Sequence, residues 1–167
     1  MRRHGLEIVT LLLFLAGACG ASPKPRTAAP EAAACQGLKI HLVTIYVDDQ
    51  DKALRFYTDV LGLAEKDDVT NGPYRWLTVT SAEDPEGTEL QLALDNDPAA
   101  KAWQSAQFQK GQPAVMFFTD DVKGDYERIK ERGGAFAMAP TEVTGSTIAQ
   151  LNDSCGNLIQ ITQLARW

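Results

Sequence analysis

Few side chains in this 167-residue chain combine reactive chemistry with an informative position. Glu89 lies in a segment, residues 88–92, that alternates polar and apolar residues as a half-buried strand does. It is either a ligand-contacting group, such as a general base, or a polar residue on a wet sheet face, and both readings are open. His41 precedes an apolar segment. Once a leader containing His4 is removed, His41 is the only imidazole left in the chain.

The three cysteines, Cys19, Cys35 and Cys155, are too far apart to form a zinc motif. No His or Asp is placed to activate one of these thiols as a nucleophile. Outside the cytosol, Cys35 and Cys155 could form a disulfide. Two separate thiols are an equal alternative, because a sequence does not show which residues are close in space.

The N-terminus predicts export. Arg2 and Arg3 precede an apolar run at residues 8–15 and small residues at 16–18, as in a secretory signal peptide covering residues 1–18. Cys19 follows directly, which resembles the lipobox of bacterial lipoproteins, although Ala16 stands where such boxes usually carry Leu. We therefore expect lipidation of Cys19 and anchoring to the bacterial envelope. The alternative is ordinary cleavage to a periplasmic or secreted protein.

Residues 19–37 are rich in Ala and Pro and show no apolar periodicity, so they predict a solvated tether. The remaining residues, 38–167, are long enough for one folded domain, and 44% of the whole chain is hydrophobic. The net charge of −6 argues against a nucleic-acid partner, because neutralising phosphates requires a basic surface.

The organisation of the folded part is repeated. An apolar segment, an acidic pair and an amphipathic helix follow one another at residues 42–61 and again at 114–132. Asp48 and Asp49 lie 72 positions before a second acidic pair, and Gly62 lies 72 before Gly134, so we expect these glycines to end the two helices. Neither half buries its sheet face alone, so the two halves must pack together. The predicted strands are 39–47, 63–69, 74–80, 88–94, 114–119, 135–139, 146–151 and 157–163, and the predicted helices are 50–61, 98–110 and 122–132.

Two motifs carry a family resemblance. The segment V-D-D-x-D-K-A-L-x-F-Y-x-x-V-L-G-L begins at Val47, and D-x-x-G-N-L-I-Q-I begins at Asp153. Together with the repeat, they resemble the vicinal oxygen chelate superfamily of glyoxalase I, bleomycin-resistance proteins and extradiol dioxygenases, over about residues 38–164. The resemblance implies an α+β fold of two tandem βαβββ modules. These form a curled, cup-shaped mixed sheet with helices outside and the ligand inside, in chains that often form homodimers.

Enzymes of this superfamily hold a divalent metal with four side chains, typically two His and two Glu. The resemblance maps those positions to Leu42, Glu89, Ala114 and Gln160. Leu and Ala cannot bind a metal, and a neutral amide is a poor substitute for a carboxylate. We therefore expect no metal, no other cofactor and no catalytic residue. His41 does not repair the site, because its place in the strand puts it on the same face as Val43, towards the helices.

Strand parity predicts which side chains line the cup, and their mixture of apolar, aromatic and hydrogen-bonding groups is typical of a small-molecule pocket. The segment with Trp103 and Phe108 could close the cup or form a dimer contact. The leading hypothesis is an exported small-molecule-binding protein. The alternatives are a metal-dependent lyase, isomerase or dioxygenase using Glu89, and an interaction module whose cup is filled by a partner. The predicted lining residues are Leu42, Thr44, Tyr46, Trp76, Glu89, Gln91, Ala114, Met116, Phe118, Gln160 and Thr162.

Overall fold

The computed structural model describes residues 37–165. The predicted signal peptide, the tether up to residue 36, and the side chains of Cys19 and Cys35 lie outside this range. Within the described range, no helix is both long enough and apolar enough to cross a membrane.

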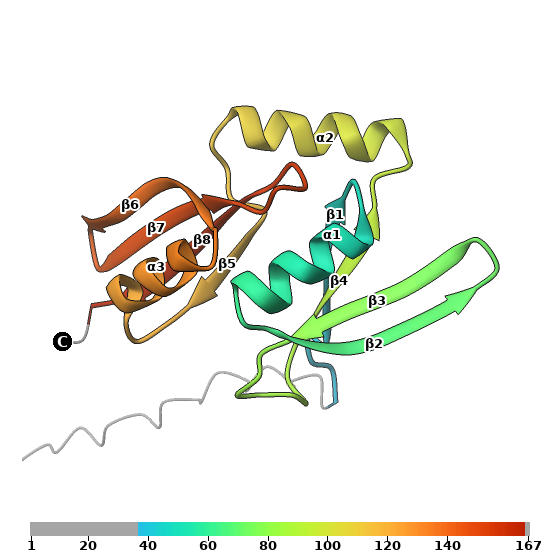
Figure 1. The fold of residues 1–167 in the computed structure, drawn as a ribbon, viewed down its shortest axis with the longest axis horizontal. Coiled ribbons are helices and arrows are strands. Elements are labelled where there is room, and N and C mark those ends of the chain that lie inside the picture. Colours follow the sequence, from blue (N-terminus) through green and yellow to red (C-terminus); the bar gives the residue numbers. More distant parts are fainter. Residues whose placement is uncertain (1–36, 166–167) are drawn as a thin grey trace, which may run out of the picture. The chain divides into compact units, whose positions relative to one another are not determined.

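Two βαβββ modules follow each other along the chain, joined by helix α2 (Figure 1). Each module forms its own four-stranded sheet, in the orders β1-β4-β3-β2 and β5-β8-β7-β6. The first strand of each module pairs in parallel with the last, and the other pairs are antiparallel. The predicted α+β class and the duplicated module are confirmed. The elements are β1 (Leu42–Val47), α1 (Gln50–Arg55), η1 (Phe56–Val60), β2 (Ala64–Asn71), β3 (Tyr74–Thr80), β4 (Glu89–Leu94), α2 (Pro98–Gln109), β5 (Val115–Phe118), α3 (Val122–Glu131), β6 (Ala135–Val143), β7 (Ser146–Asn152) and β8 (Leu158–Leu164).

The acidic pairs start the helices. In the first module, Asp49 caps α1, and its carboxylate accepts a hydrogen bond of 2.9 Å from the backbone N–H of Lys52. In the second module, Asp121 caps α3 and accepts a bond of 3.0 Å from the N–H of Gly124. Each bond satisfies one of the free N–H groups of a first helical turn. The second residue of each pair is therefore the cap.

The two helices end differently from the prediction. Gly62 has the expected left-handed backbone, with φ of +88°, but its counterpart is Gly133, with φ of +94°, and not Gly134. The first helix continues from α1 into the π-helical turn η1, which accommodates one more residue than an α-helical path does. That extra residue explains why the repeat of 72 positions fails by one at the helix ends.

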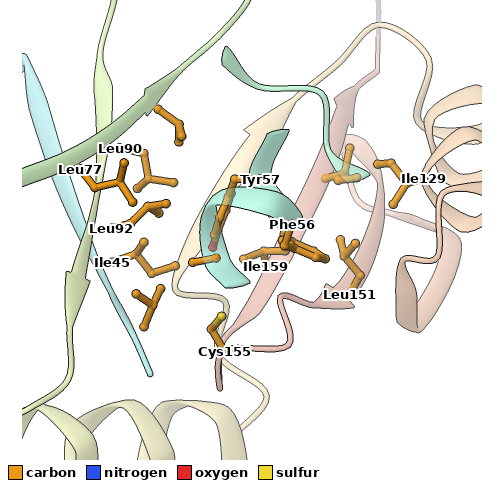
Figure 2. Packing of buried hydrophobic residues seen from close by; sticks show 14 of the residues in the cluster. Ile45, Phe56, Tyr57, Leu77, Leu90, Leu92, Ile129, Leu151, Cys155 and Ile159 are labelled. Atoms are coloured by element: carbon orange, nitrogen blue, oxygen red, sulfur yellow. The ribbon is translucent and has the colours of Figure 1, made fainter. Parts of the chain in front are cut away.

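One hydrophobic core serves both modules. It combines the inner faces of the two sheets with residues of η1 and α3. Figure 2 shows Phe56 and Tyr57 between Leu77 and Leu92 of the first sheet and Leu151 of the second. The predicted dependence of each half on the other is confirmed. The π-helical turn buries two consecutive residues, Phe56 and Tyr57, in this core.

A buried carboxylate joins the modules. Asp153, in the β7–β8 loop, accepts a hydrogen bond of 3.1 Å from the hydroxyl of Tyr57, and both side chains are inaccessible to solvent. The same loop reaches the end of β1, because Asn157 Nδ2 donates to the carbonyl of Tyr46 at 2.8 Å. Burial raises the pKa of Asp153, although four hydrogen bonds to its carboxylate oppose that shift.

Candidate functional site

Apart from Ala114, which packs against the core, the predicted lining residues lie on the sheet faces opposite the core. In β4, Leu90 and Leu92 belong to the core, so Glu89 and Gln91 point to the other face. In β8, Ile159 belongs to the core, and its neighbours in the strand point away from it. Each sheet therefore has one face against the helices and an opposite face, the ligand face, that carries these lining residues.

The ligand face of the first sheet carries a chain of hydrogen bonds. Thr44 Oγ1 donates to Gln91 Oε1 at 2.9 Å, and Gln91 Nε2 donates to the hydroxyl of Tyr74 at 3.1 Å. Gln91 is buried, while Thr44 and Tyr74 are exposed. Half-buried Trp76 shares this face by strand parity. The network fixes the amide of Gln91 in one orientation and leaves the oxygen of Tyr74 available to a ligand.

The ligand face of the second sheet repeats this arrangement. Gln150 Nε2 donates to Gln160 Oε1 at 3.1 Å, and Gln160 Nε2 donates to Thr162 Oγ1 at 3.0 Å. The same Nε2 lies 3.7 Å from Met116 Sδ. Met116 and Phe118 on the edge strand are 52% and 66% exposed. Both sheets thus combine a buried glutamine with exposed apolar groups.

The strand registers show that Gln91 in the first module occupies the position equivalent to Gln160 in the second module. Thr44 lies opposite Gln91, and Met116, which is 72 positions after Thr44, lies opposite Gln160. The structure therefore differs by two residues from the mapping that put Glu89 at the position equivalent to Gln160. The connection before β4 (residues 81–88) is longer than the connection before β8 (residues 153–157), so sequence spacing cannot be carried from one module to the other.

Glu89 lies opposite Leu42, at the start of both strands. Its Oε1 is 3.6 Å from Nε2 of His41, and the two side chains are 9% and 56% exposed. His41 precedes β1, where strand alternation no longer holds, so it reaches the ligand face instead of sharing the face of Val43. His41 and Glu89 thus form a contact between an imidazole and a carboxylate at the start of β1.

The lining residues form two sets, which lie on the two separate sheets of the chain. Leu42, Thr44, Tyr46 and Trp76 belong to the first sheet, whereas Ala114 and the residues of β5 and β8 belong to the second. Across the described residues, no side-chain hydrogen bond joins a lining residue of one sheet to a lining residue of the other. Each face lies on the side of its sheet away from the common core. A cup lined by both sets therefore needs more than the contacts within one chain.

Sequence reasoning missed two members of these networks, Tyr74 and Gln150. Both could have been found, because Tyr74 shares the parity of Trp76 in β3 and Gln150 is directly opposite Gln160 in β7. The predicted roles of Trp103 and Phe108 are not decided, although both are exposed on α2. Helix α2 is attached instead through buried Gln104, whose Nε2 donates to the carbonyl of Tyr46 at 2.9 Å.

Cys155 is buried in the middle of the loop that holds Asn157, and it forms no disulfide with another described residue. Burial, together with the neighbouring carboxylate of Asp153, raises the pKa of its thiol to about 12. A thiol with so little thiolate at neutral pH is a poor nucleophile. The expectation that Cys155 is not catalytic agrees with this environment, whereas its pairing with Cys35 stays a prediction.

Comparison with known proteins assigns the fold to a family. The family described as "Glyoxalase/Bleomycin resistance protein/Dioxygenase superfamily" matches residues 39–161. The chain belongs to this superfamily. YurT of Bacillus subtilis (strain 168), described as an uncharacterised protein, is 48% identical over 126 residues, which cover 75% of this chain and 99% of YurT.

Two solved structures of the superfamily fold are similar to the domain. UcmS2 is 31% identical with a TM-score of 0.66, and the match covers 75% of this chain and 97% of UcmS2. TnmS3, described as an antibiotic binding protein from Streptomyces sp. CB03234, is 28% identical with a TM-score of 0.62. That match covers 77% of this chain and 97% of TnmS3. The superfamily includes both enzymes and binding proteins, so the site residues must decide between them.

Proposed function

We propose that this protein binds a small molecule on its ligand faces without a metal and without catalysing a reaction. The observation that carries the proposal is that the strand registers place Gln91 and Gln160 at equivalent positions of the two modules. With this register, the four positions that hold the metal in superfamily enzymes are Leu42, Gln91, Ala114 and Gln160. None of them has an anionic or imidazole side chain, so they do not fit a divalent cation. Among the described residues, no group of three His, Cys, Asp or Glu side chains could hold a metal either.

The chemistry of the faces indicates the ligand class. Buried amides of Gln91 and Gln160 offer neutral hydrogen-bonding groups, and exposed Met116 and Phe118 offer apolar contact. Such a surface suits a partly aromatic, amphiphilic molecule whose polar groups are uncharged. The description of TnmS3 as an antibiotic binding protein supports a role in binding and sequestering such a molecule.

A homodimer would complete the site. Each ligand face is open in one chain and lies on the side of its sheet away from the common core, so a second copy can place the face of its second sheet over the first sheet of this chain. Exposed apolar side chains on both faces, Val69 and Tyr74 on one and Phe118 and Leu164 on the other, are of the kind that interfaces bury. The two glutamine networks would then face a single ligand.

Metal content and bound ligand test the proposal together. Protein purified directly from cells should contain no stoichiometric Ni, Zn, Fe or Mn. Native mass spectrometry should show a bound small molecule, or binding of an added aromatic amphiphile, that is lost in Gln91→Leu and Gln160→Leu. Gln112→Leu, in the loop before β5, is the matched control and should bind as wild type does. A stoichiometric metal, or equal binding by all the variants, would contradict the proposal.

The second candidate function is a metal-dependent lyase, isomerase or dioxygenase, and the contact between His41 and Glu89 favours it. A buried carboxylate 3.6 Å from an imidazole could act as a general base. This candidate requires chelator-sensitive turnover of a dicarbonyl adduct or a catechol that disappears in Glu89→Ala. If Glu89→Ala and His41→Ala both match wild type, the candidate is excluded.

We also propose that the chain is exported and anchored to the bacterial envelope through a lipid on Cys19. The apolar run at residues 8–15 and the small residues before Cys19 support this proposal. Acyl labelling and membrane fractionation test it, because Cys19→Ser should lose the label and move to the soluble fraction. Unchanged fractionation of Cys19→Ser would refute the lipid anchor. If the wild type is exported but soluble, the signal peptide is supported and the anchor is refuted.

A further inference from the structure

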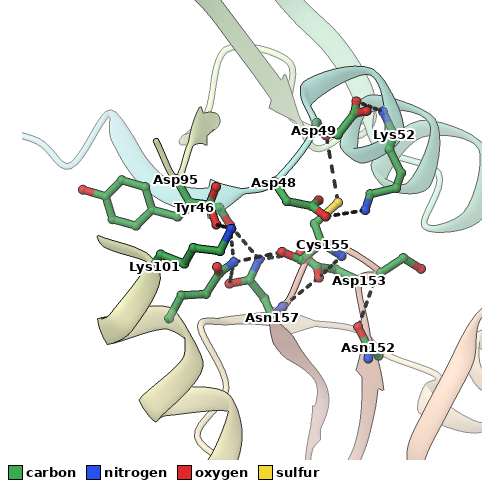
Figure 3. A network of polar contacts seen from close by, with 12 residues as sticks. Tyr46, Asp48, Asp49, Lys52, Asp95, Lys101, Asn152, Asp153, Cys155 and Asn157 are labelled. Atoms are coloured by element: carbon green, nitrogen blue, oxygen red, sulfur yellow. Dashed lines mark hydrogen bonds and ion pairs between the residues drawn. The ribbon is translucent and has the colours of Figure 1, made fainter. Parts of the chain in front are cut away.

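A cavity lies under α2, at the ends of β1 and β4 and against the β7–β8 loop. Its volume is about 290 Å³, near the lower end of the range for small-molecule sites. It shares no residue with the ligand-face networks, and part of its wall is shown in Figure 3. The lining residues are Asp48, Asp95, Lys101, Gln104, Ser105, Phe108, Gln109, Cys155 and Gly156.

The carboxylate of Asp95 is the first acceptor in the cavity wall that receives no hydrogen bond from the described chain. Asp95 is only 8% exposed and lines the cavity, yet within the described chain no group donates a hydrogen bond to its side chain. The nearest cation, Lys101 Nζ, is 3.9 Å away, beyond hydrogen-bond distance, on a side chain that is 67% exposed. Among the described residues no side-chain oxygen is both fully buried and without a hydrogen bond, so the Asp95 oxygens reach the open cavity, where water or a ligand can donate to them.

Gln104 supplies a second acceptor without a donor. Its Nε2 is within hydrogen-bond distance of three acceptors, the carbonyls of Tyr46 and Cys155 at 2.9 Å each and Oδ1 of Asn157 at 3.1 Å, and these fix the orientation of the amide. The amide oxygen Oε1 consequently points away from these carbonyls, and no donor to it is found among residues 37–165. Gln104 also lines the cavity.

The other walls define what kind of donor fits. Asp48 adds a carboxylate whose present partner, Lys52 Nζ, is 2.7 Å away at the mouth. Phe108 adds an aromatic ring, a surface that stabilises both cations and apolar groups. With Asp48, Asp95 and Lys101 as the charged lining residues, the formal charge of the wall is negative.

We propose that this cavity binds the primary ammonium group of a small organic amine, with the apolar substituent of the amine against Phe108. An ammonium group has three N–H donors, and the wall offers an acceptor at Asp95 and another at Gln104. A metal ion fits less well, since the described residues include no cluster of three acidic, His or Cys ligands here. This site is independent of the function proposed for the ligand faces.

Lys101 indicates how the site is regulated. Its ammonium is tethered on α2, carries the same chemical group as the proposed ligand and approaches the same carboxylate. It therefore acts as an intramolecular competitor that a free amine must displace. Removing the Lys101 charge should strengthen amine binding, whereas removing the Asp95 charge should weaken it.

Titration with benzylamine, which is a cation at pH 7, tests the inference, with neutral benzyl alcohol as the matched probe. We expect benzylamine, but not benzyl alcohol, to shift the backbone amide NMR signals of Ser105 and Gly156. Asp95→Asn should weaken benzylamine binding at least about tenfold, and Lys101→Met should strengthen it by about threefold or more. Both effects have the size expected when one charge–charge interaction is removed from a partly buried site.

The charge control is Glu127→Gln on exposed α3, which changes the net charge of the chain by the same amount as Asp95→Asn. Binding by this variant should equal that of wild type. The inference is overturned if benzylamine shifts no cavity signal in either wild type or Lys101→Met. It is also overturned if Asp95→Asn and Glu127→Gln weaken binding equally, which would show that only the net charge matters. Circular dichroism of each variant confirms that the fold is retained.

Discussion

Replacing Tyr57 by Phe removes the single hydroxyl that joins the two modules through a buried hydrogen bond. Tyr57 lies in η1 of the first module, and its acceptor, Asp153, lies in the β7–β8 loop of the second. The ring stays in the core, so the change removes the hydrogen bond at 3.1 Å and almost no packing. The variant therefore measures what this one contact contributes to the coupling of the modules.

The expected loss follows from burial and from the other donors. A hydrogen bond to a charged group contributes roughly 1.5–3 kcal/mol. Asp153 keeps bonds from the backbone N–H groups of Cys155 and Asn157 and from the Asn157 amide, so its carboxylate is not left unpaired. We therefore expect a loss of about 2 kcal/mol in the free energy of unfolding. For a domain of this size, that corresponds to a decrease in Tm of about 6–10 °C.

Urea denaturation at pH 7, followed by circular dichroism, measures the effect. The matched control is Tyr126→Phe on α3, since the Tyr126 ring packs on Phe136 and no hydrogen bond of its hydroxyl is found in the described domain. The control should lose no more than about 0.5 kcal/mol, as is usual away from buried polar contacts. If Tyr57→Phe is as stable as the control, the hydrogen bond does not couple the modules and the reasoning is refuted.

Three further outcomes follow from single groups. Burial raises the pKa of Asp153 above 3.8 in the folded protein. Protonation of Asp153 therefore stabilises the fold fully below about pH 4, and this stabilisation is lost as the pH rises through the folded-state pKa. Urea denaturation from pH 4 to 7 should therefore show wild type losing stability relative to Asp153→Asn, and a constant difference would contradict this. In a Cys19→Ser/Cys35→Ser background, a thiol reagent at pH 8 should label Cys155 only after unfolding, since its pKa is raised to about 12, and rapid labelling of folded protein would contradict its burial. Gly134→Ala should cost about 1–3 kcal/mol in thermal denaturation, because the added methyl group would overlap Ile129; unchanged stability would show that the turn can adjust.

The fold could be predicted from the sequence because its signals are local and occur twice. The acidic caps before each helix, the Gly72-Pro73 turn and the alternation of β4 each depend on a few neighbouring residues. The π-helical turn was not predictable in this way. Its extra residue is tolerated because Phe56 and Tyr57 fit between two sheets, and that fit depends on side chains about 100 positions further along the chain.

The sequence predicted which sheet face most site residues lie on, but it did not predict which residues they contact. Strand parity correctly put Thr44 and Gln91 on one face, since they are hydrogen-bonded there. It could not place His41 against Glu89, because alternation ends where the strand ends. The cavity under α2 was invisible in the sequence, because its walls come from three segments that are distant in sequence and become neighbours only through the contacts of Gln104.

The sheet orders leave four edge strands, and they differ in their protection against unwanted strand addition. Edge strand β2 carries the charged residues 65–68, and β6 contains Pro140 and two register irregularities, so both are poor templates for a further strand. Strands β1 and β5 have no charged residue, and they expose Val43 on β1 and Met116 and Phe118 on β5. The aggregation risk of the domain is thus greater on these two strands, and the exposed residues of β5 also belong to a ligand face. A mutation that empties or uncovers that face should lower solubility before it lowers stability.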